Sequence, residues 1–154
     1  MDGDAARPRF AEISTAFPTV PESVAAARRF VSVSLRRFAF SEDAIEDARL
    51  ATSELVASAF AAGRPPIRIR VRSLDDGKAI VEVSHGVGDE PTEDGADGDV
   101  LHLSSAGRTV VESTASRWGS RPSGGGVVAW FEIDDETVTT GTSAGTTATA
   151  SPAG

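Results

Sequence analysis

Apolar side chains recur every three or four residues in two stretches of the chain, the spacing that lines them up along one side of a helix. The first stretch begins at Pro21, because proline is tolerated in a first helical turn. Its apolar positions are Val24, Ala27, Val31, Leu35 and Phe38, and the arginines largely off this stripe are Arg28, Arg29, Arg36 and Arg37. The second stretch begins at Ser41, a good N-cap residue, and ends at Gly63, a good C-terminal stop. The pattern predicts two consecutive helices.

Apolar and polar side chains alternate, as in half-buried strands, in residues 9–17, 67–72, 79–84 and 127–133. In one of these stretches the polar positions are Arg68, Arg70 and Arg72. The pair Asp76-Gly77 predicts a tight hairpin turn, and 117–120 is expected to pair with the last strand across a glycine-rich turn. A short helix is expected to begin near Gly107. Hairpin-linked strands beside grouped helices predict an α+β fold, a two-layer sandwich of a mainly antiparallel sheet covered by helices.

Three segments differ from the rest in composition. Residues 1–8 are polar and are expected to be loose, and 134–154 form a Thr/Ala/Gly tail with almost no bulky side chains. Such a tail buries too little apolar area to offset its chain entropy, so we expect it to be disordered. The stretch from His85 to Asp99 holds six acidic residues and no basic one, which predicts a mobile loop or lid. The folded domain is therefore expected to span residues 9–133.

The composition excludes several kinds of site and partner. The 154 residues include no cysteine and two histidines, which rules out disulfides, zinc-thiolate sites and cysteine nucleophiles. A net charge of −8 argues against binding nucleic acid, whose phosphates need a basic surface. No apolar run approaches the roughly 20 residues of a membrane-spanning helix. We expect a cytoplasmic protein that binds neither nucleic acid nor membrane.

The residues alone offer few candidates for chemistry. Glu54 and Ser58 are four residues apart and share one face of the second helix, where they either orient water or an ion or are polar neighbours of the core stripe. His85 is either an exposed loop residue or a ligand contact in a pocket. The glycines from Gly124 to Gly126 either bend around a ligand or form a hairpin tip. These alternatives stay open at this point.

Four strings of the sequence resemble one bacterial family. They are FPTVPESVAAARRFV, DARLATSELVASAF, VEVSHG and VVESTASRWGSRPSGGGVVAWFEI. Their combination is similar to the anti-sigma-factor serine/threonine kinases, members of the Bergerat-fold (GHKL, histidine-kinase-like ATPase) superfamily with histidine kinases, gyrase and Hsp90. The resemblance spans roughly residues 10–133 and is especially close to the small actinobacterial members. It implies the same two-layer α+β fold.

The resemblance places the family's first ATP motif on the second helix. Family members carry a glutamate that positions or deprotonates the attacking hydroxyl and, four residues later, an asparagine that holds magnesium. This sequence has Glu54 and then Ser58. A serine hydroxyl can ligate Mg²⁺ but is shorter than the amide and lacks its carbonyl oxygen. The resemblance therefore implies a vestigial catalytic Glu54 and a weak magnesium ligand at Ser58.

The other two ATP motifs are altered as well. The second is an aspartate after a strand, which accepts a hydrogen bond from the adenine amino group; this sequence has His85, followed by Gly86. A neutral imidazole accepts that bond in only one tautomer. The third is a glycine pair that lets the backbone approach the phosphates. This sequence has Ser105 and Gly107, and so keeps one glycine of the two.

The resemblance implies a transcriptional regulator with an altered nucleotide site. We expect it to bind a sigma factor, an anti-anti-sigma (STAS) protein or both, with ATP binding and kinase activity weakened or lost and no cofactor needed. The alternative is an active serine/threonine kinase that uses ATP and Mg²⁺ to phosphorylate a STAS partner, so its status as an enzyme stays open. Family members commonly dimerise through the sheet and N-terminal region, which implies a homodimer or a heterodimer with a paralogue. The arginine-rich faces either meet an acidic partner or are solvated surface.

Overall fold

A computed structural model describes residues 11–62, 65–74, 77–86 and 103–135. Along these residues the elements are β1 (Glu12–Phe17), α1 (Glu22–Arg37), α2 (Glu42–Ala62), β2 (Ile67–Leu74), β3 (Lys78–His85), α3 (Ser105–Thr114), β4 (Arg117–Ser123) and β5 (Gly126–Asp134). The expected loose segment 1–8, the acidic loop beyond Gly86 and residues 136–154 of the expected tail lie outside the described residues. Asp134 ends β5 and Asp135 is buried, so the folded domain extends two residues past the expected end at 133. The order of elements agrees with the sequence pattern.

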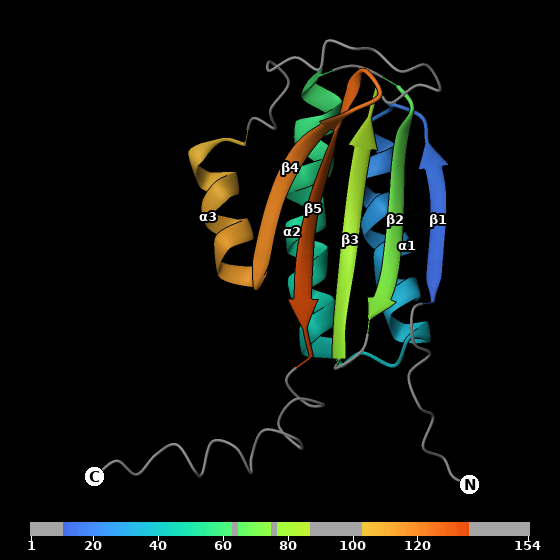
Figure 1. Cartoon of the computed structure of the whole chain (residues 1–154), viewed down its shortest axis with the longest axis vertical. Helices are drawn as coiled ribbons and strands as arrows, with labels where there is room; N and C mark the ends of the chain where they lie inside the picture. Colours follow the sequence, from blue (N-terminus) through green and yellow to red (C-terminus); the bar gives the residue numbers. More distant parts are fainter. Residues whose placement is uncertain (1–10, 63–64, 75–76, 87–102, 136–154) are drawn as a thin grey trace, which may run out of the picture.

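The five strands form one antiparallel sheet with the order β1-β2-β3-β5-β4. The last strand of the chain, β5, lies between β3 and β4, so the final hairpin folds back toward the middle of the sheet (Figure 1). The register sets His85 opposite Ile67 on β2 and Val127 on β5. The end of β3 is therefore held by paired backbone on both sides.

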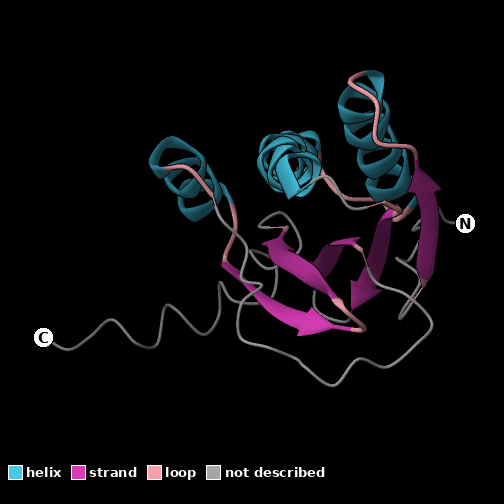
Figure 2. Cartoon of the chain, turned by 90° about the horizontal axis from the view of Figure 1, so that it is seen from above, coloured by secondary structure: helices cyan, strands magenta, loops and turns pink. Residues whose placement is uncertain are grey.

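The three described helices all cover the same face of the sheet (Figure 2). Alternate residues of each strand point into this layer and pack with the apolar stripes of the helices. The largest fully buried side chains include Leu35, Leu55, Ile69 and Phe131. The other face of the sheet carries the remaining alternate residues, and no described helix packs on it. The predicted two-layer α+β sandwich is confirmed.

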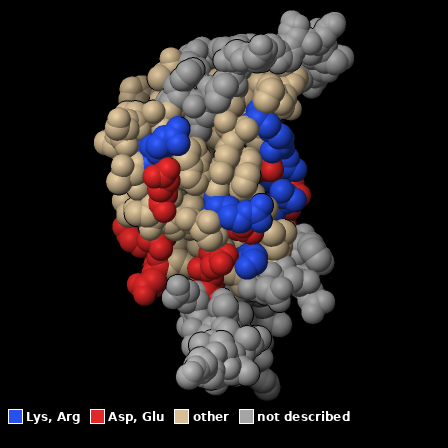
Figure 3. All heavy atoms as spheres, turned by 60° about the vertical axis from the view of Figure 1, so that its left-hand side comes forward, with Lys and Arg blue, Asp and Glu red and all other residues tan. Residues whose placement is uncertain are grey.

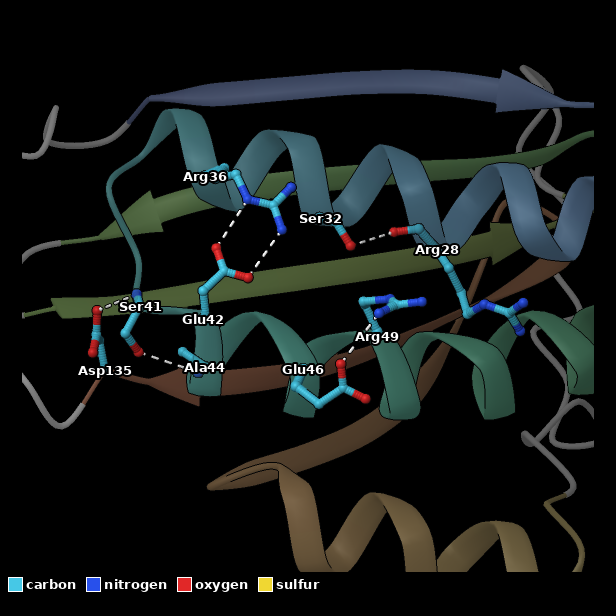
Figure 4. A network of polar contacts seen from close by, with 9 residues as sticks. All are labelled: Arg28, Ser32, Arg36, Ser41, Glu42, Ala44, Glu46, Arg49 and Asp135. Atoms are coloured by element: carbon cyan, nitrogen blue, oxygen red, sulfur yellow. Dashed lines mark hydrogen bonds and ion pairs between the residues drawn. The ribbon is translucent and has the colours of Figure 1, made fainter.

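Polar contacts fix the turn from α1 into α2 (Figure 4). Arg36 donates two hydrogen bonds of 3.0 Å, one to each carboxylate oxygen of Glu42. The Ser41 hydroxyl accepts a hydrogen bond from the backbone N–H of Ala44 at 3.2 Å, which confirms Ser41 as the N-cap of α2. The backbone N–H of Ser41 donates to the buried carboxylate of Asp135 at 3.0 Å. The end of the sheet is thereby tied to the start of α2.

Candidate functional site

Glu54 and Ser58 lie on one face of α2, as their spacing predicts. Both are half-buried and flank the apolar stripe of the helix. The buried positions of that stripe are Ala44, Ile45, Ala48, Ala51, Thr52, Leu55, Val56 and Ala59. Its many alanines let neighbouring elements come close, and α2 packs against α1, α3 and the strands β2, β3 and β5. Glu54 and Ser58 are therefore carried by the most enclosed helix of the described structure.

The helix α3 begins at Ser105, two residues before the start predicted near Gly107. The cause is Ser104, whose hydroxyl accepts a hydrogen bond of 2.9 Å from the backbone N–H of Gly107. A serine at this position satisfies one of the N–H groups that a first helical turn leaves without a partner. Sequence reasoning missed Ser104, although a serine three residues before a glycine that opens an apolar pattern is an N-cap signal. Ser105 itself is exposed.

Glu54 and Gly107 come into close contact where α2 packs on α3. A Cβ atom on Gly107 would lie 2.6 Å from Glu54 Oε1 and 3.2 Å from Ser104 Oγ. Only a glycine leaves room for the carboxylate in this arrangement. The Glu54 side chain thus lies at the N-terminal end of α3, where the helix dipole favours negative charge. The arrangement offers a half-buried carboxylate that can accept a hydrogen bond or a proton.

His85 is the last residue of β3, and only 7% of its surface is exposed. The interpretation as an exposed loop histidine is therefore wrong. His85 has the same parity along the strand as Val81 and Val83, which are buried beneath the helices, so it belongs to the covered face of the sheet. Gly86 follows with φ of 67°, a conformation that glycine adopts without strain, and the strand ends there.

Residues 17–125 match the histidine kinase-like ATPase domain. The match includes α2 with Glu54, the end of β3 with His85 and the start of α3 with Gly107. The chain belongs to the histidine kinase-like ATPase domain family. The predicted family is thereby confirmed at the level of this domain.

A solved structure supports the fold of this ATPase domain. It contains the RsbU and RsbW domains of a Mycobacterium tuberculosis protein and superposes with a TM-score of 0.60, at 14% identity, over 81% of this chain and 32% of that chain. The present chain thus spans about a third of that neighbour, and the likeness is one of fold. No curated protein matches the chain.

The described part of the ATPase domain has neither a membrane-spanning helix nor a group of metal-ligating side chains. None of its helices has the length and apolar character needed to cross a bilayer. No three of its histidine and acidic side chains are grouped as a metal site would require.

The arginines of α1 lie on the outer side of the ATPase domain. Those exposed to solvent are Arg29, Arg36 and Arg37. The hydrogen bond from Arg36 lowers the pKa of Glu42 below its ordinary value of 4.5, and the same bond raises the pKa of Arg36. Both side chains of this pair are largely exposed, so its effect on stability is small.

A second set of arginines lies on the sheet face that the helices leave open. Arg68, Arg70 and Arg72 on β2 were expected there, and the structure adds Arg117 and Arg121 from β4. Sequence reasoning could not join the two groups, because their proximity depends on β5 inserting between β3 and β4. The structure also places Glu82, 7% exposed, among these arginines.

Proposed function

We propose that this ATPase-domain protein is an anti-sigma-type regulator that controls transcription by binding a protein partner, with ATP binding and phosphoryl transfer weakened or lost. The family assignment supports the scaffold, and the fold likeness to a structure that includes an RsbW domain supports the type of regulation. We take the partner to be a sigma factor, a STAS protein or both.

The observation that carries the proposal is Ser58, one helical turn after Glu54. An amide is expected there to hold magnesium, and the serine hydroxyl ends closer to the helix axis. Magnesium demands nearly ideal octahedral geometry with ligand distances of about 2.0–2.1 Å. The helix α2 cannot shift to make up the missing length, because it packs on both neighbouring helices and on the sheet. The donor set therefore fits Mg-ATP poorly.

The end of β3 supports the same conclusion. His85 occupies the position where the family resemblance implies an aspartate, which accepts a hydrogen bond from the adenine amino group. A neutral imidazole offers one acceptor nitrogen, whereas a carboxylate offers two oxygens. Strand pairing to Ile67 and Val127 on both sides keeps His85 from moving to compensate. An adenine would gain less binding energy here than at a carboxylate.

The start of α3 adds a third argument. The family's glycine pair lets the backbone approach the phosphates, and a helix N-terminus is a favourable place for an anion. In this protein the one retained glycine, Gly107, lies against the Glu54 carboxylate. A phosphate that approached the same end of α3 would meet that negative charge. The family's glycine pair is thus reduced to a single glycine, and that glycine is already in contact with a side chain of this protein.

An active kinase is the second candidate, and the retained Glu54 favours it. A half-buried carboxylate is suited to take the proton of an attacking hydroxyl. In that case Ser58 and His85 contact magnesium and adenine in spite of their altered chemistry.

Partner binding with and without nucleotide separates the two functions. The purified protein is titrated calorimetrically with the sigma factors and STAS proteins of its own genome, first alone and then with Mg-ATP present. We expect at least one partner to bind with an affinity that nucleotide leaves unchanged. The matched variant Glu54→Gln should bind equally well. Binding that requires Mg-ATP, or phosphorylation of a STAS protein that Glu54→Gln abolishes, would establish the kinase instead, and no binding by any candidate would refute the regulator.

A further inference from the structure

The open face is the face of the sheet that points away from the helices (Figure 2). It is built from alternate residues of the five strands, which the register sets side by side. Its charged side chains are Glu12, Arg68, Arg70, Arg72, Lys78, Glu82, Arg117, Arg121, Glu132 and Asp134, and its larger apolar ones are Ile80, Val128 and Trp130. The charged groups thus surround a short apolar strip.

The open face has the opposite sign of charge to the whole chain. Its five arginines outnumber its three glutamates by two, and Lys78 pairs with Asp134 at 3.6 Å. The full sequence carries a net charge of −8. In Figure 3 basic side chains run along the right-hand side of the view, with acidic side chains between and below them. A concentration of positive charge on an acidic protein is a feature that an acidic partner would recognise.

Glu82 holds three of these arginines in place. Its oxygens lie 3.0 Å from Arg70 Nη2, 3.3 Å from Arg72 Nη2 and 3.9 Å from Arg121 Nη2. The Glu82 side chain is 9% exposed, whereas those of the arginines are 44%, 35% and 52% exposed. Arg70 also pairs with Glu12 at 3.2 Å, and these two carboxylates cannot neutralise three guanidinium groups. The arginines are therefore ordered in advance and still carry excess charge, which lowers the entropy cost of meeting a partner.

Two shallow hollows lie on either side of Glu82. One, of about 240 Å³, is lined by Glu12, Ser14, Arg68, Arg70, Glu82, Ser84 and Val128. The other, of about 320 Å³, is lined by Arg72, Ile80, Glu82, Arg117, Arg121, Trp130 and Glu132. Apolar side chains and arginines line both hollows, with Val128 in the first and Ile80 and Trp130 in the second. Such hollows suit side chains that combine a short apolar stem with a carboxylate.

We infer that the open face docks the acidic surface of a partner protein. This inference rests on the proposed function in taking a protein as the occupant. A second copy of the chain, which the family resemblance implies as a possible occupant of the sheet, would set two faces with excess positive charge against each other. Nucleic acid would bring a uniformly negative backbone against Glu12, Glu82 and Glu132, whereas a protein surface can oppose those carboxylates with its own basic groups. The charge of the open face therefore favours an acidic protein over a second copy of the chain and over nucleic acid.

The test uses a defined acidic probe and two variants of equal charge. Arg68 forms no ion pair with a described residue, and Arg121 is the most distant of the Glu82 partners, so Arg68→Gln with Arg121→Gln leaves Arg70 and Arg72 to balance Glu82. The matched control is Arg29→Gln with Arg37→Gln on α1, both exposed, which changes the net charge equally. Fluorescein-labelled octaglutamate is titrated into the full chain and both variants by anisotropy at low salt. A labelled single-stranded DNA octamer is the second probe, and light scattering gives the oligomeric state.

We expect octaglutamate to bind the parent and the control variant alike, to bind the Arg68/Arg121 variant at least tenfold more weakly, and to dissociate as salt rises. Equal affinities for the two variants, or no binding by the parent, would overturn the inference. Tighter binding of the DNA octamer would assign the face to nucleic acid instead. If the parent and the control variant are dimers and the Arg68/Arg121 variant is a monomer, the open face is instead the contact with a second copy of the chain. None of these results depends on sigma-factor or STAS binding, so this experiment and the titration with those partners can fail independently.

Discussion

The Glu54 carboxylate on α2 contacts the backbone of Gly107 on α3 so closely that a Cβ atom on Gly107 would lie 2.6 Å from Glu54 Oε1. This contact gives Gly107 a structural role that needs no nucleotide. Ser105, the other position of the predicted glycine pair, is exposed at the first residue of α3. The retained glycine is thus the one whose lack of a side chain accommodates the Glu54 carboxylate in this position. Its presence is no evidence for ATP binding.

Replacing Gly107 by alanine tests this contact. Alanine favours a helix over glycine by up to about 1 kcal/mol, but here its methyl group displaces the Glu54 carboxylate. We expect the parent and Gly107→Ala to differ by less than about 1 kcal/mol in free energy of unfolding, because a flexible side-chain end can rotate away. In a protein that already carries Glu54→Ala, Gly107→Ala should raise the free energy of unfolding by about 0.5 kcal/mol or more relative to its effect in the parent. Urea unfolding of the four proteins gives this coupling, and equal effects in both backgrounds would show that the contact is absent.

Gly119 on β4 leaves room for the indole of Trp130 on β5. A Cβ atom on Gly119 would lie 3.0 Å from Trp130 Cζ2 and 3.3 Å from Nε1. Because the ring is rigid, Gly119→Ala should lower the free energy of unfolding by about 1–2 kcal/mol, which is in the lower range for overpacking a side chain. Ser120→Ala on the same strand is the control and should cost less. If Gly119→Ala destabilises a Trp130→Ala background by as much as the parent, the cost comes from another source.

Asp135 ties the end of β5 to the start of α2. Its carboxylate accepts a hydrogen bond from the backbone N–H of Ser41 at 3.0 Å, and the residue is 1% exposed. Asp135→Ala leaves that N–H without its acceptor and should lower the free energy of unfolding by about 1–3 kcal/mol. Asp135→Asn keeps an acceptor oxygen and should cost less. Thermal unfolding compares the two, and equal losses would mean that the hydrogen bond contributes nothing.

The Arg36–Glu42 pair predicts a small acid-dependent loss of stability. Hydrogen bonding to Arg36 lowers the pKa of Glu42 below 4.5 in the folded protein. A carboxylate with a lowered folded pKa stabilises the protein above its unfolded pKa, and this contribution disappears as the pH falls through the folded pKa. The difference in Tm between the parent and Arg36→Gln should therefore be constant at neutral pH and vanish in acid. A difference that persists well below the folded pKa would contradict the assignment.

Local patterns predicted much of the fold. The two long helices followed from apolar residues at helical spacing, and Ser41 was identified as a cap from its chemistry alone. The hairpin between β2 and β3 followed from alternation on both sides of Asp76-Gly77. These features depend on neighbours in the sequence, which a pattern records directly.

Features that depend on distant segments were missed. The burial of His85 follows from its place on the helix-covered face of a central strand, and nothing near His85 in the sequence encodes the helices and the strand β5 that enclose it. The contact between Glu54 and Gly107 joins two helices that are far apart along the chain. Spacing could place Glu54 beside Ser58, whereas only the packing of α3 on α2 shows what faces the carboxylate. The cap Ser104 was overlooked because the helix was assigned from its apolar residues.

Calorimetric titration with Mg-ATP tests the central claim, that this fold is kept while its nucleotide site is impaired. The parent is compared with a variant that carries both Ser58→Asn and His85→Asp, which restores the amide and the carboxylate of the family motifs. We predict no heat and no thermal shift for the parent at several millimolar Mg-ATP, and measurable binding by the variant. Binding of Mg-ATP to the parent at micromolar to sub-millimolar concentration would contradict the account and establish a nucleotide-binding protein with unusual ligands.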